Sequence, residues 1–313
     1  PMRECFLGID PSTYTTSAAL FGEGKALENR KRLLPVKPGE RGLRQSDAVF
    51  HHVRQLPEVL GPVLEELKET PQAIGVSVSP TTEKDSYMPC FLVGKTTAEL
   101  LGKAWGVPVE HFSHQQGHIA AALYSAGKLD WMEQEFLAFH ISGGTTEALR
   151  VRPDEKGLPQ VTLVGRSLDL KAGQAVDRVG VLLGLSFPCG PELERLALQW
   201  EGGLSYRPVL KGHDCSLSGI ENQCKAMIQR GDPPEKTARY CLEALAAVLD
   251  KMCGGLLQEL GDLPVVFSGG VCSNSLLRQR LCAKYGAVFA APEFSSDNAA
   301  GAAVLCWKKR STL

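Results

Sequence analysis

The stretch FLAFHISGGTTEALRV at residues 136–151 decides the fold, because it repeats a pattern already present in FLGIDPSTYTTSAALF at residues 6–21. In both stretches an apolar run leads into a turn rich in hydroxyl groups or glycine, and a second apolar run follows, which predicts strand, turn and strand. The aligned positions are Phe6–Leu7 with Phe136–Leu137, Ser12 with Ser142, Thr15–Thr16 with Thr145–Thr146, and Ala18 with Ala148. One unit used twice predicts an α/β protein with two duplicated lobes, each opening with a hairpin.

The rest of the chain alternates in the way that a duplicated α/β architecture requires. Helical periodicity marks residues 41–70, 91–106 and 235–260, and a buried type of strand is expected at residues 73–80. We expect lobe I to comprise residues 1–107, joined by a C-terminal helix at residues 295–313. Lobe II is expected at residues 108–294.

Composition narrows the class of protein. The chain has 313 residues, of which 43% are hydrophobic and 22% charged, as in soluble two-domain proteins. A net charge of -1 gives no overall basic field, so contact with a nucleic acid would need a local patch or a partner protein. We expect no membrane span and no signal peptide. The 10 cysteines are scattered without a CxxC pair, which favours reduced thiols in the cytoplasm.

Two glycine turns are candidates for binding a phosphate group, SGGTT at residues 142–146 and SGGVCSN at residues 268–274. The second lies between a predicted strand and a predicted helix, where backbone amides can approach an anion closely. A tight turn that merely needs a positive φ is the competing interpretation. Neither turn matches the Rossmann or P-loop pattern. Glycine turns in both lobes resemble the sugar-kinase/actin (ASKHA) superfamily, in which a nucleotide occupies the cleft between two duplicated RNase H-like lobes.

HQQGH at residues 114–118 is a candidate metal site. His114 and His118 are about one helical turn apart, so both imidazoles would project from the same face of a helix. A zinc protease of the HExxH type needs a glutamate directly after the first histidine, and Gln115 cannot act as that base. The pattern therefore disfavours peptide hydrolysis and leaves metal binding open, with a third ligand to be supplied from elsewhere.

With these motifs in order, the whole chain resembles the TsaD-type tRNA threonylcarbamoyltransferases, also described as glycoproteases or O-sialoglycoprotein endopeptidases. The family's HxxGH pair matches His114 and His118, and its SGGHT turn matches residues 142–146. AGQAVDRVGVLLGLSFPCGP at residues 172–191 and CSLSGIEN at residues 215–222 resemble two further family segments. The family's GGVxxN motif matches residues 269–274, and its CTDN motif resembles SSDN at residues 295–298.

The resemblance implies a metal site and a nucleotide site. His114, His118 and Asp297 would hold one divalent ion, iron or zinc, and a role for Mg²⁺ stays open. No catalytic residue beyond these ligands is assigned. The residues implied in binding ATP or an adenylate are Asp10, Ser142, Gly143, Gly144, Thr145, Asp177, Gly190, Glu194, Gly269, Gly270 and Asn274. The implied reaction moves a threonylcarbamoyl group from an adenylate to N6 of a tRNA adenosine, with AMP leaving.

Several positions depart from the family pattern. Tyr14 and Thr15 stand where carboxylates are expected, and SPTTEKDSYMPC at residues 79–90 replaces a glycine-rich loop. Further departures are Thr145 at a histidine position, Glu221 at a lysine position, Cys189 at a glycine position and Gln116 at a glutamate position. These changes indicate a divergent paralogue, and the loss of lysine and histidine should weaken binding of the phosphate.

Two alternatives to tRNA threonylcarbamoylation stay open. The chain could be a non-catalytic, nucleotide-binding partner or regulator of a standard homologue, or it could carbamoylate a small molecule. The resemblance also implies helper proteins and either a homodimer or a heterodimer with a family paralogue.

Overall fold

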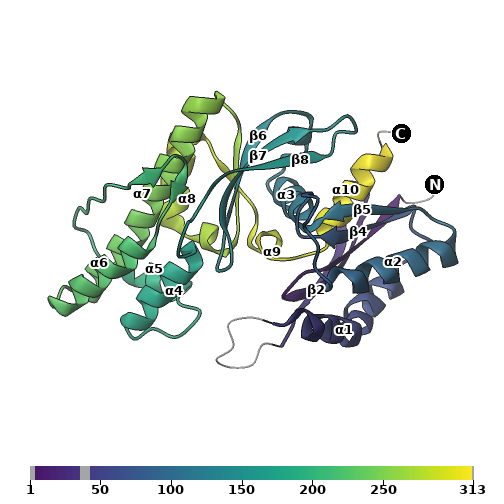
Figure 1. Cartoon of the computed structure of the whole chain (residues 1–313), viewed down its shortest axis with the longest axis horizontal. Coiled ribbons are helices and arrows are strands. Elements are labelled where there is room, and N and C mark those ends of the chain that lie inside the picture. The colour runs from purple at the N-terminus through teal and green to yellow at the C-terminus, as the bar shows by residue number, and fades with distance from the viewer. Residues whose placement is uncertain (1–3, 36–42, 312–313) are drawn as a thin grey trace. The chain divides into compact units, whose positions relative to one another are not determined.

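The computed structural model describes residues 4–35 and 43–311 (Figure 1). It contains two five-stranded sheets with the same order of strands. The first sheet has the order β3-β2-β1-β4-β5 and the second β8-β7-β6-β11-β12. In the first sheet the strands are β1 (Cys5–Pro11), β2 (Thr15–Gly22), β3 (Lys25–Leu33), β4 (Ala73–Ser79) and β5 (Val109–Ser113). The second consists of β6 (Phe136–Ile141), β7 (Thr146–Pro153), β8 (Pro159–Arg166), β11 (Val265–Ser268) and β12 (Val288–Phe289). The duplication predicted from the sequence is therefore confirmed at the level of topology.

The two repeated hairpins also share one register. Phe6 pairs with Phe21 as Phe136 pairs with Val151, and Pro11 pairs with Thr16 as Ile141 pairs with Thr146. Their turns close in the same way, because the backbone N–H at the first turn position donates to the carbonyl oxygen three residues later. That distance is 2.9 Å from Ser12 to Thr15 and 2.7 Å from Ser142 to Thr145.

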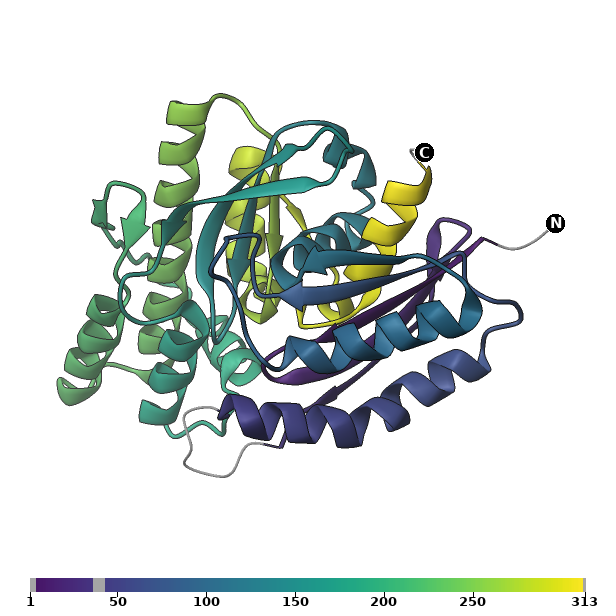
Figure 2. The same cartoon turned by 45° about the vertical axis from the view of Figure 1, so that its right-hand side comes forward.

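The chain divides into two compact units, and the first comprises residues 1–134, 152–161 and 293–313. Its helices are α1 (Gln45–Glu65), α2 (Phe91–Trp105), α3 (His114–Ser125), η1 (Leu129–Glu133), α9 (Pro292–Ser295) and α10 (Ala300–Ser311). Helix α9 begins one residue before residue 293, where this unit resumes. Along β1, Leu7 and Ile9 pack in an apolar cluster with α1 and α2. The alternate residue Gly8 faces α10, where an added Cβ would lie 2.3 Å from the carbonyl oxygen of Ala299. Strand periodicity thus separates two helical layers on the two faces of this sheet (Figure 2).

The second unit comprises residues 135–151 and 162–292. Its helices are α4 (Ala172–Leu182), α5 (Gly190–Ala197), α6 (Ser218–Gln229), α7 (Pro234–Leu260), η2 (Gly270–Ser273) and α8 (Ser275–Tyr285), and a two-stranded ribbon joins β9 (Leu210–Lys211) to β10 (Asp214–Cys215). Leu137, Phe139 and Ile141 of β6 are fully buried in the core that α4 to α8 build.

The boundary expected at residue 107 differs from the observed one, because residues 108–134 group with the first unit. The physical reason is pairing: β5 adds to the edge of β4, with Ile74 beside Val109. Helix α3, which follows β5 directly, then packs on α10, where a Cβ on Gly301 would lie 1.8 Å from the carbonyl oxygen of Gly117. Residues 293–313, which include the C-terminal helix, also group with the first unit.

Within residues 4–35 and 43–311, no helix is both long and apolar enough to cross a bilayer.

Candidate metal centre and nucleotide pocket

Helix α3 begins at His114 because a capping box fixes its first turn. The Ser113 hydroxyl accepts from the backbone N–H of Gln116 at 3.2 Å, and Gln116 Oε1 accepts from the backbone N–H of Ser113 at 2.9 Å. The other end of the Gln116 amide donates to the carbonyl oxygen of Pro159 at 2.8 Å. Gln116, which stands at a glutamate position of the family pattern, therefore caps the N-terminus of α3. His114 and His118, four residues apart on this helix, project from the same face.

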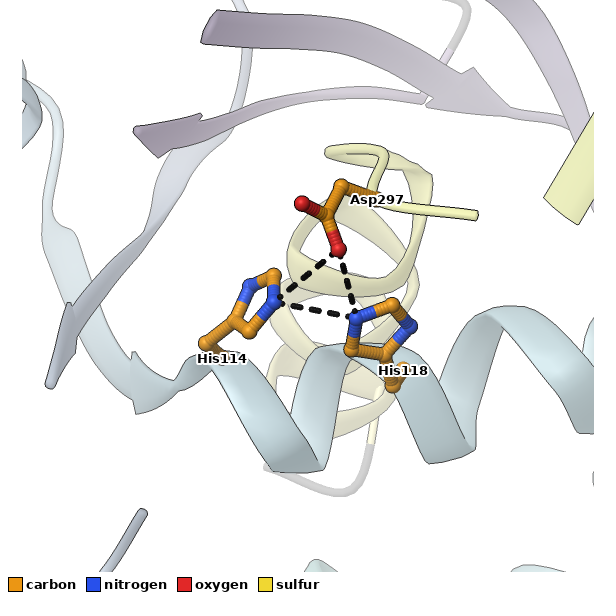
Figure 3. A group of neighbouring side chains, drawn as sticks. All are labelled: His114, His118 and Asp297. Carbon is orange, nitrogen blue, oxygen red and sulfur yellow. Dashed lines mark hydrogen bonds and ion pairs between the residues drawn. The ribbon is translucent and has the colours of Figure 1, made fainter. Parts of the chain in front are cut away.

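The structure brings His114, His118 and Asp297 together, as Figure 3 shows. His118 Nε2 lies 2.9 Å from His114 Nε2 and 3.0 Å from Asp297 Oδ1. His114 Nε2 lies 3.4 Å from the same carboxylate oxygen. Asp297 precedes α10, in the segment where Asn298 Oδ1 accepts from the backbone N–H of Ala300 at 3.1 Å. Two distant segments of the first unit thus meet at three potential ligand atoms.

This donor set fits a divalent transition metal. Three ligands bound tetrahedrally at 2.0–2.2 Å lie about 3.3–3.6 Å apart, close to the separations observed here. Two imidazoles and one carboxylate with open positions suit iron or zinc.

Asp10 contacts His114 at Nδ1, the ring nitrogen that faces away from His118 and Asp297. Its Oδ2 lies 2.8 Å from His114 Nδ1, and the Ser77 hydroxyl donates to the same oxygen at 2.7 Å. Only 1% of Asp10 is exposed. Asp10 is expected among the nucleotide-binding residues, and that role stays a prediction; the structure places its buried carboxylate against His114.

The turn at residues 12–15 contacts the third candidate ligand, Asp297. The Ser12 hydroxyl donates to Asp297 Oδ2 at 2.7 Å, and the Thr15 hydroxyl donates to the same oxygen at 3.1 Å. Asp297 Oδ1 faces the histidines instead. Thr15, one of the departures from the family pattern, therefore supplies a hydrogen bond to the Asp297 carboxylate in place of a negative charge.

The charges of the site stabilise one another. Burial alone would lower the pKa of His114, but the charge and hydrogen bond of Asp10, together with Asp297, raise that pKa well above its usual value. Burial would raise the pKa of Asp297, yet hydrogen bonds from His114 and His118 hold it well below its usual value. The charged forms of His114 and Asp297 thus favour one another. A cation bound at His114 Nε2 would require that nitrogen to be deprotonated.

The second unit contains a separate pocket of about 460 Å³. Its wall includes six of the residues implied in nucleotide binding: Gly143, Asp177, Gly190, Glu194, Gly270 and Asn274. Asp177 Oδ1 accepts from the backbone N–H of Cys189 at 2.8 Å, and Glu194 Oε1 accepts from that of Ser275 at 2.8 Å. Asn274 caps α8 by accepting from the backbone N–H of Leu276 at 3.1 Å.

Four other residues implied in nucleotide binding, Ser142, Gly144, Thr145 and Gly269, lie outside this wall. They shape the turns beside it: Ser142 Oγ accepts from the backbone N–H of Thr145 at 3.1 Å, and Gly269 has φ +99°. Sequence reasoning missed Gly173, Val176, Pro188, Pro191, Leu242, Val271 and Ser273, which complete the wall. An apolar residue such as Leu242, from the middle of a core helix, carries no local signal that it borders a pocket.

Among the described residues that line the pocket, two are carboxylates and none is basic. Glu221, at a lysine position of the family pattern, is neutralised by Arg178 at 3.2 Å and Lys225 at 2.7 Å. The carboxylates of Asp177 and Glu194 can therefore accept hydrogen bonds from hydroxyl groups of a ligand. An anionic group of a ligand would instead have to bind to backbone amides at the glycine turns.

Comparison with known proteins identifies the family. The family model of the tRNA N6-adenosine threonylcarbamoyltransferases, TsaD, matches residues 37–304.

Solved structures show the fold. Full-length HypF in a phosphate- and nucleotide-bound form matches with a TM-score of 0.60 and 12% sequence identity. The match covers 97% of this chain and 55% of HypF, so this chain spans about half the length of HypF. Component A of the (R)-2-hydroxyglutaryl-CoA dehydratase of Acidaminococcus fermentans matches at 0.54 and 17% identity over 99% of both chains. A ROK family glucokinase from Streptomyces griseus, in complex with glucose and AMPPNP, matches at 0.54 and 14% identity over 96% of this chain and 98% of that one. The expected fold of two α/β lobes is confirmed by the two sheets and by these structural matches.

Proposed function

The chain belongs to the tRNA N6-adenosine threonylcarbamoyltransferase family, and from that membership we propose that it is a metal-dependent carbamoyl-type transferase. The donor is an adenylate carrying a threonylcarbamoyl group, and the acceptor is N6 of a tRNA adenosine. The observation that carries this proposal is the convergence of His114, His118 and Asp297, because that set is suited to holding a Lewis acid.

The metal ligands would be His114 Nε2, His118 Nε2 and Asp297 Oδ1. When bound, an iron or zinc ion would supply polarisation of the acyl-phosphate group of the donor. Asp10 keeps His114 in the tautomer that presents Nε2, and the Ser12 and Thr15 hydroxyls bond Asp297 Oδ2, so that Oδ1 is the oxygen that faces the histidines.

The second-unit pocket would take the nucleoside part of the donor. Asp177 and Glu194 can accept hydrogen bonds from hydroxyl groups of a ribose, and the glycines at positions 143 and 270 leave backbone amides open toward a phosphate. In the transfer itself, the amine nitrogen forms a bond to the carbamoyl carbon and the bond from that carbon to the phosphate oxygen breaks. AMP leaves with the electron pair, and the amine gives up one proton to solvent.

A reconstituted assay tests this function. Purified protein would be combined with threonine, bicarbonate, ATP, tRNA and the enzyme that forms the adenylate, and the tRNA nucleosides analysed by mass spectrometry. We expect threonylcarbamoyladenosine from the wild type and none from His118→Ala. If the wild type yields no product in the presence of its helper proteins and of iron or zinc, the tRNA reaction is excluded.

Two alternatives have specific support. A non-catalytic partner is favoured by Tyr14 and Thr15 in the N-terminal turn and by the loop at residues 79–90, where Ser86 Oγ accepts from the backbone N–H of Thr81 at 2.9 Å. Protein isolated without metal, together with a His118→Ala variant that behaves normally, would support that role. A small-molecule acceptor is favoured by the near-neutral net charge of -1, and product analysis with and without tRNA distinguishes it.

The first unit also offers a surface for a partner. A groove of about 610 Å³ lies between α1 and α2, lined by apolar residues such as Val53, Leu60 and Leu92. We place the pairing with a family paralogue or a second copy at this groove. The free state of all ten cysteines agrees with a reducing, cytoplasmic location.

A further inference from the structure

The turn that carries Ser12 and Thr15 contacts one fully buried side chain, His52 of α1, on the side away from Asp297. His52 Nε2 lies 2.7 Å from the carbonyl oxygen of Ser12, and His52 Nδ1 lies 2.8 Å from the Thr16 hydroxyl. The ring therefore bridges the two ends of the turn. Because a carbonyl oxygen can only accept, the hydrogen must sit on Nε2.

The duplicated turn of the second unit satisfies the same two groups differently. There the carbonyl oxygen of Ser142 accepts from the backbone N–H of Gly173 at 3.0 Å, and the Thr146 hydroxyl accepts from that of Ala172 at 2.8 Å. Both donors belong to the first turn of α4. One histidine in the first unit thus stands where two backbone amides stand in its repeat.

The front of the same turn faces the candidate metal centre. The Ser12 hydroxyl reaches Asp297 Oδ2 at 2.7 Å, so Ser12 is bonded to His52 through its carbonyl group and to the ligand through its side chain. A shift of the turn would move the hydroxyl away from the carboxylate, since both groups belong to one residue.

We propose that His52 is a positioning residue for the metal centre, acting through Ser12 on the orientation of Asp297. The inference rests on the proposed function, because it gives Asp297 the role of a ligand. It assigns no contact between His52 and the metal or a substrate. The bond that matters is the one from His52 Nε2 to the Ser12 carbonyl oxygen, which does not depend on the charge of the ring.

Two variants of His52 separate positioning from general packing. In His52→Gln the amide nitrogen reaches about where Nε2 lies and can still donate to Ser12, whereas in His52→Asn the amide nitrogen replaces only Nδ1. Thr146→Val is the matched control, because it removes the hydroxyl group at the corresponding position of the second turn, with its hydrogen bond to the backbone N–H of Ala172. The probe is Co²⁺, whose affinity is measured by chelator competition and whose visible spectrum reports the ligand geometry. Crystal structures of the metal-free variants provide a readout that needs no metal.

We expect His52→Gln and Thr146→Val to bind Co²⁺ with close to wild-type affinity and spectrum. His52→Asn should lose about 10- to 100-fold in affinity, as for other residues that orient ligands, with an altered spectrum. In its metal-free crystal structure the hydrogen bond between Ser12 and Asp297 should be absent. A folded His52→Asn variant that keeps that hydrogen bond and the wild-type affinity overturns the proposal, and so does equal loss in both His52 variants.

Two further outcomes are also decisive. If His52→Asn does not fold, Ser12→Ala replaces it, because that variant keeps the carbonyl group and cuts only the link to Asp297. Unchanged Co²⁺ affinity in Ser12→Ala overturns the proposal, and a loss supports it. If the wild type binds no Co²⁺, the proposed metal site fails, while the hydrogen bond from Ser12 to Asp297 in the crystal structures still decides the role of His52.

Discussion

Asp10 Oδ2 lies 2.8 Å from His114 Nδ1, and this contact determines which nitrogen of His114 faces the candidate metal centre. A carboxylate on one ring nitrogen leaves the other as the ligand and makes it more basic. Asp10 is in turn fixed by the Ser77 hydroxyl, and it sits at the end of β1, beside the repeated turn. The hairpin that defines the fold therefore also orients the site.

Removing the Asp10 carboxylate should weaken metal binding. We expect Asp10→Ala to lose about 10- to 100-fold in affinity for Zn²⁺ or Co²⁺, because His114 is no longer oriented. Asp10→Asn retains an oxygen that can accept from His114 Nδ1, so its loss should be smaller. Chelator competition with both variants measures the order. Equal affinity in Asp10→Ala and the wild type would show that His114 needs no orienting carboxylate.

Removing a ligand should abolish metal binding, whereas removing a neighbouring histidine should not. His118→Ala takes away one of three ligand atoms, and we expect no bound metal by elemental analysis after purification. His111→Ala is the control: its side chain is 42% exposed on β5 and lies 3.7 Å from Glu99, outside the cluster. Similar metal content in the two variants would contradict the assignment of the site.

The sequence allows the duplicated hairpins and the paired histidines to be predicted, because both depend on short-range periodicity. The repeat between residues 6–21 and 136–151 has the predicted strand, turn and strand, with identical register. Asp297 came from the ordered family motifs, since nothing local indicates that it meets α3. The roles of Asp10, Ser12 and His52 were not predictable, because each depends on a tertiary contact between segments that are distant in the sequence.

The proposed nucleotide pocket can be tested separately from the proposed metal centre. Asp177→Asn should weaken binding of AMP about tenfold or more, because a hydrogen bond to a charged group contributes about 1.5–3 kcal/mol. Asn keeps an oxygen that can accept from the backbone N–H of Cys189, so the local fold should persist. Glu192→Gln, an exposed position on the same helix as Glu194, is the matched control. Calorimetric titration with AMP measures both, and similar affinities would remove Asp177 from the proposed site.

The pH dependence of stability should show the ion-pair network around Asp250. Burial opposes ionisation of this carboxyl, but hydrogen bonds from Lys284 at 2.7 Å, Tyr285 and Arg280 at 2.9 Å lower its pKa. A carboxyl whose pKa is lower in the folded state stabilises the fold above its unfolded pKa of about 3.9 and loses that contribution as the pH falls further. The melting temperature of the wild type should therefore drop more steeply below about pH 4 than that of Asp250→Asn. Parallel curves would contradict this assignment.

The groove between α1 and α2 should control the oligomeric state. Val53 is 58% exposed on this surface, so a charged side chain there should not destabilise the isolated protein. In a complex that covers the groove the same charge would be buried, which should weaken the association. We expect Val53→Asp to reduce the mass measured by light scattering to that of a single chain, with an unchanged melting temperature for the isolated protein. Val209→Asp, at a position 80% exposed in the second unit, is the control and should leave the mass unchanged. If wild type and Val53→Asp have the same mass, both alone and when mixed with a family paralogue, pairing through this groove is excluded.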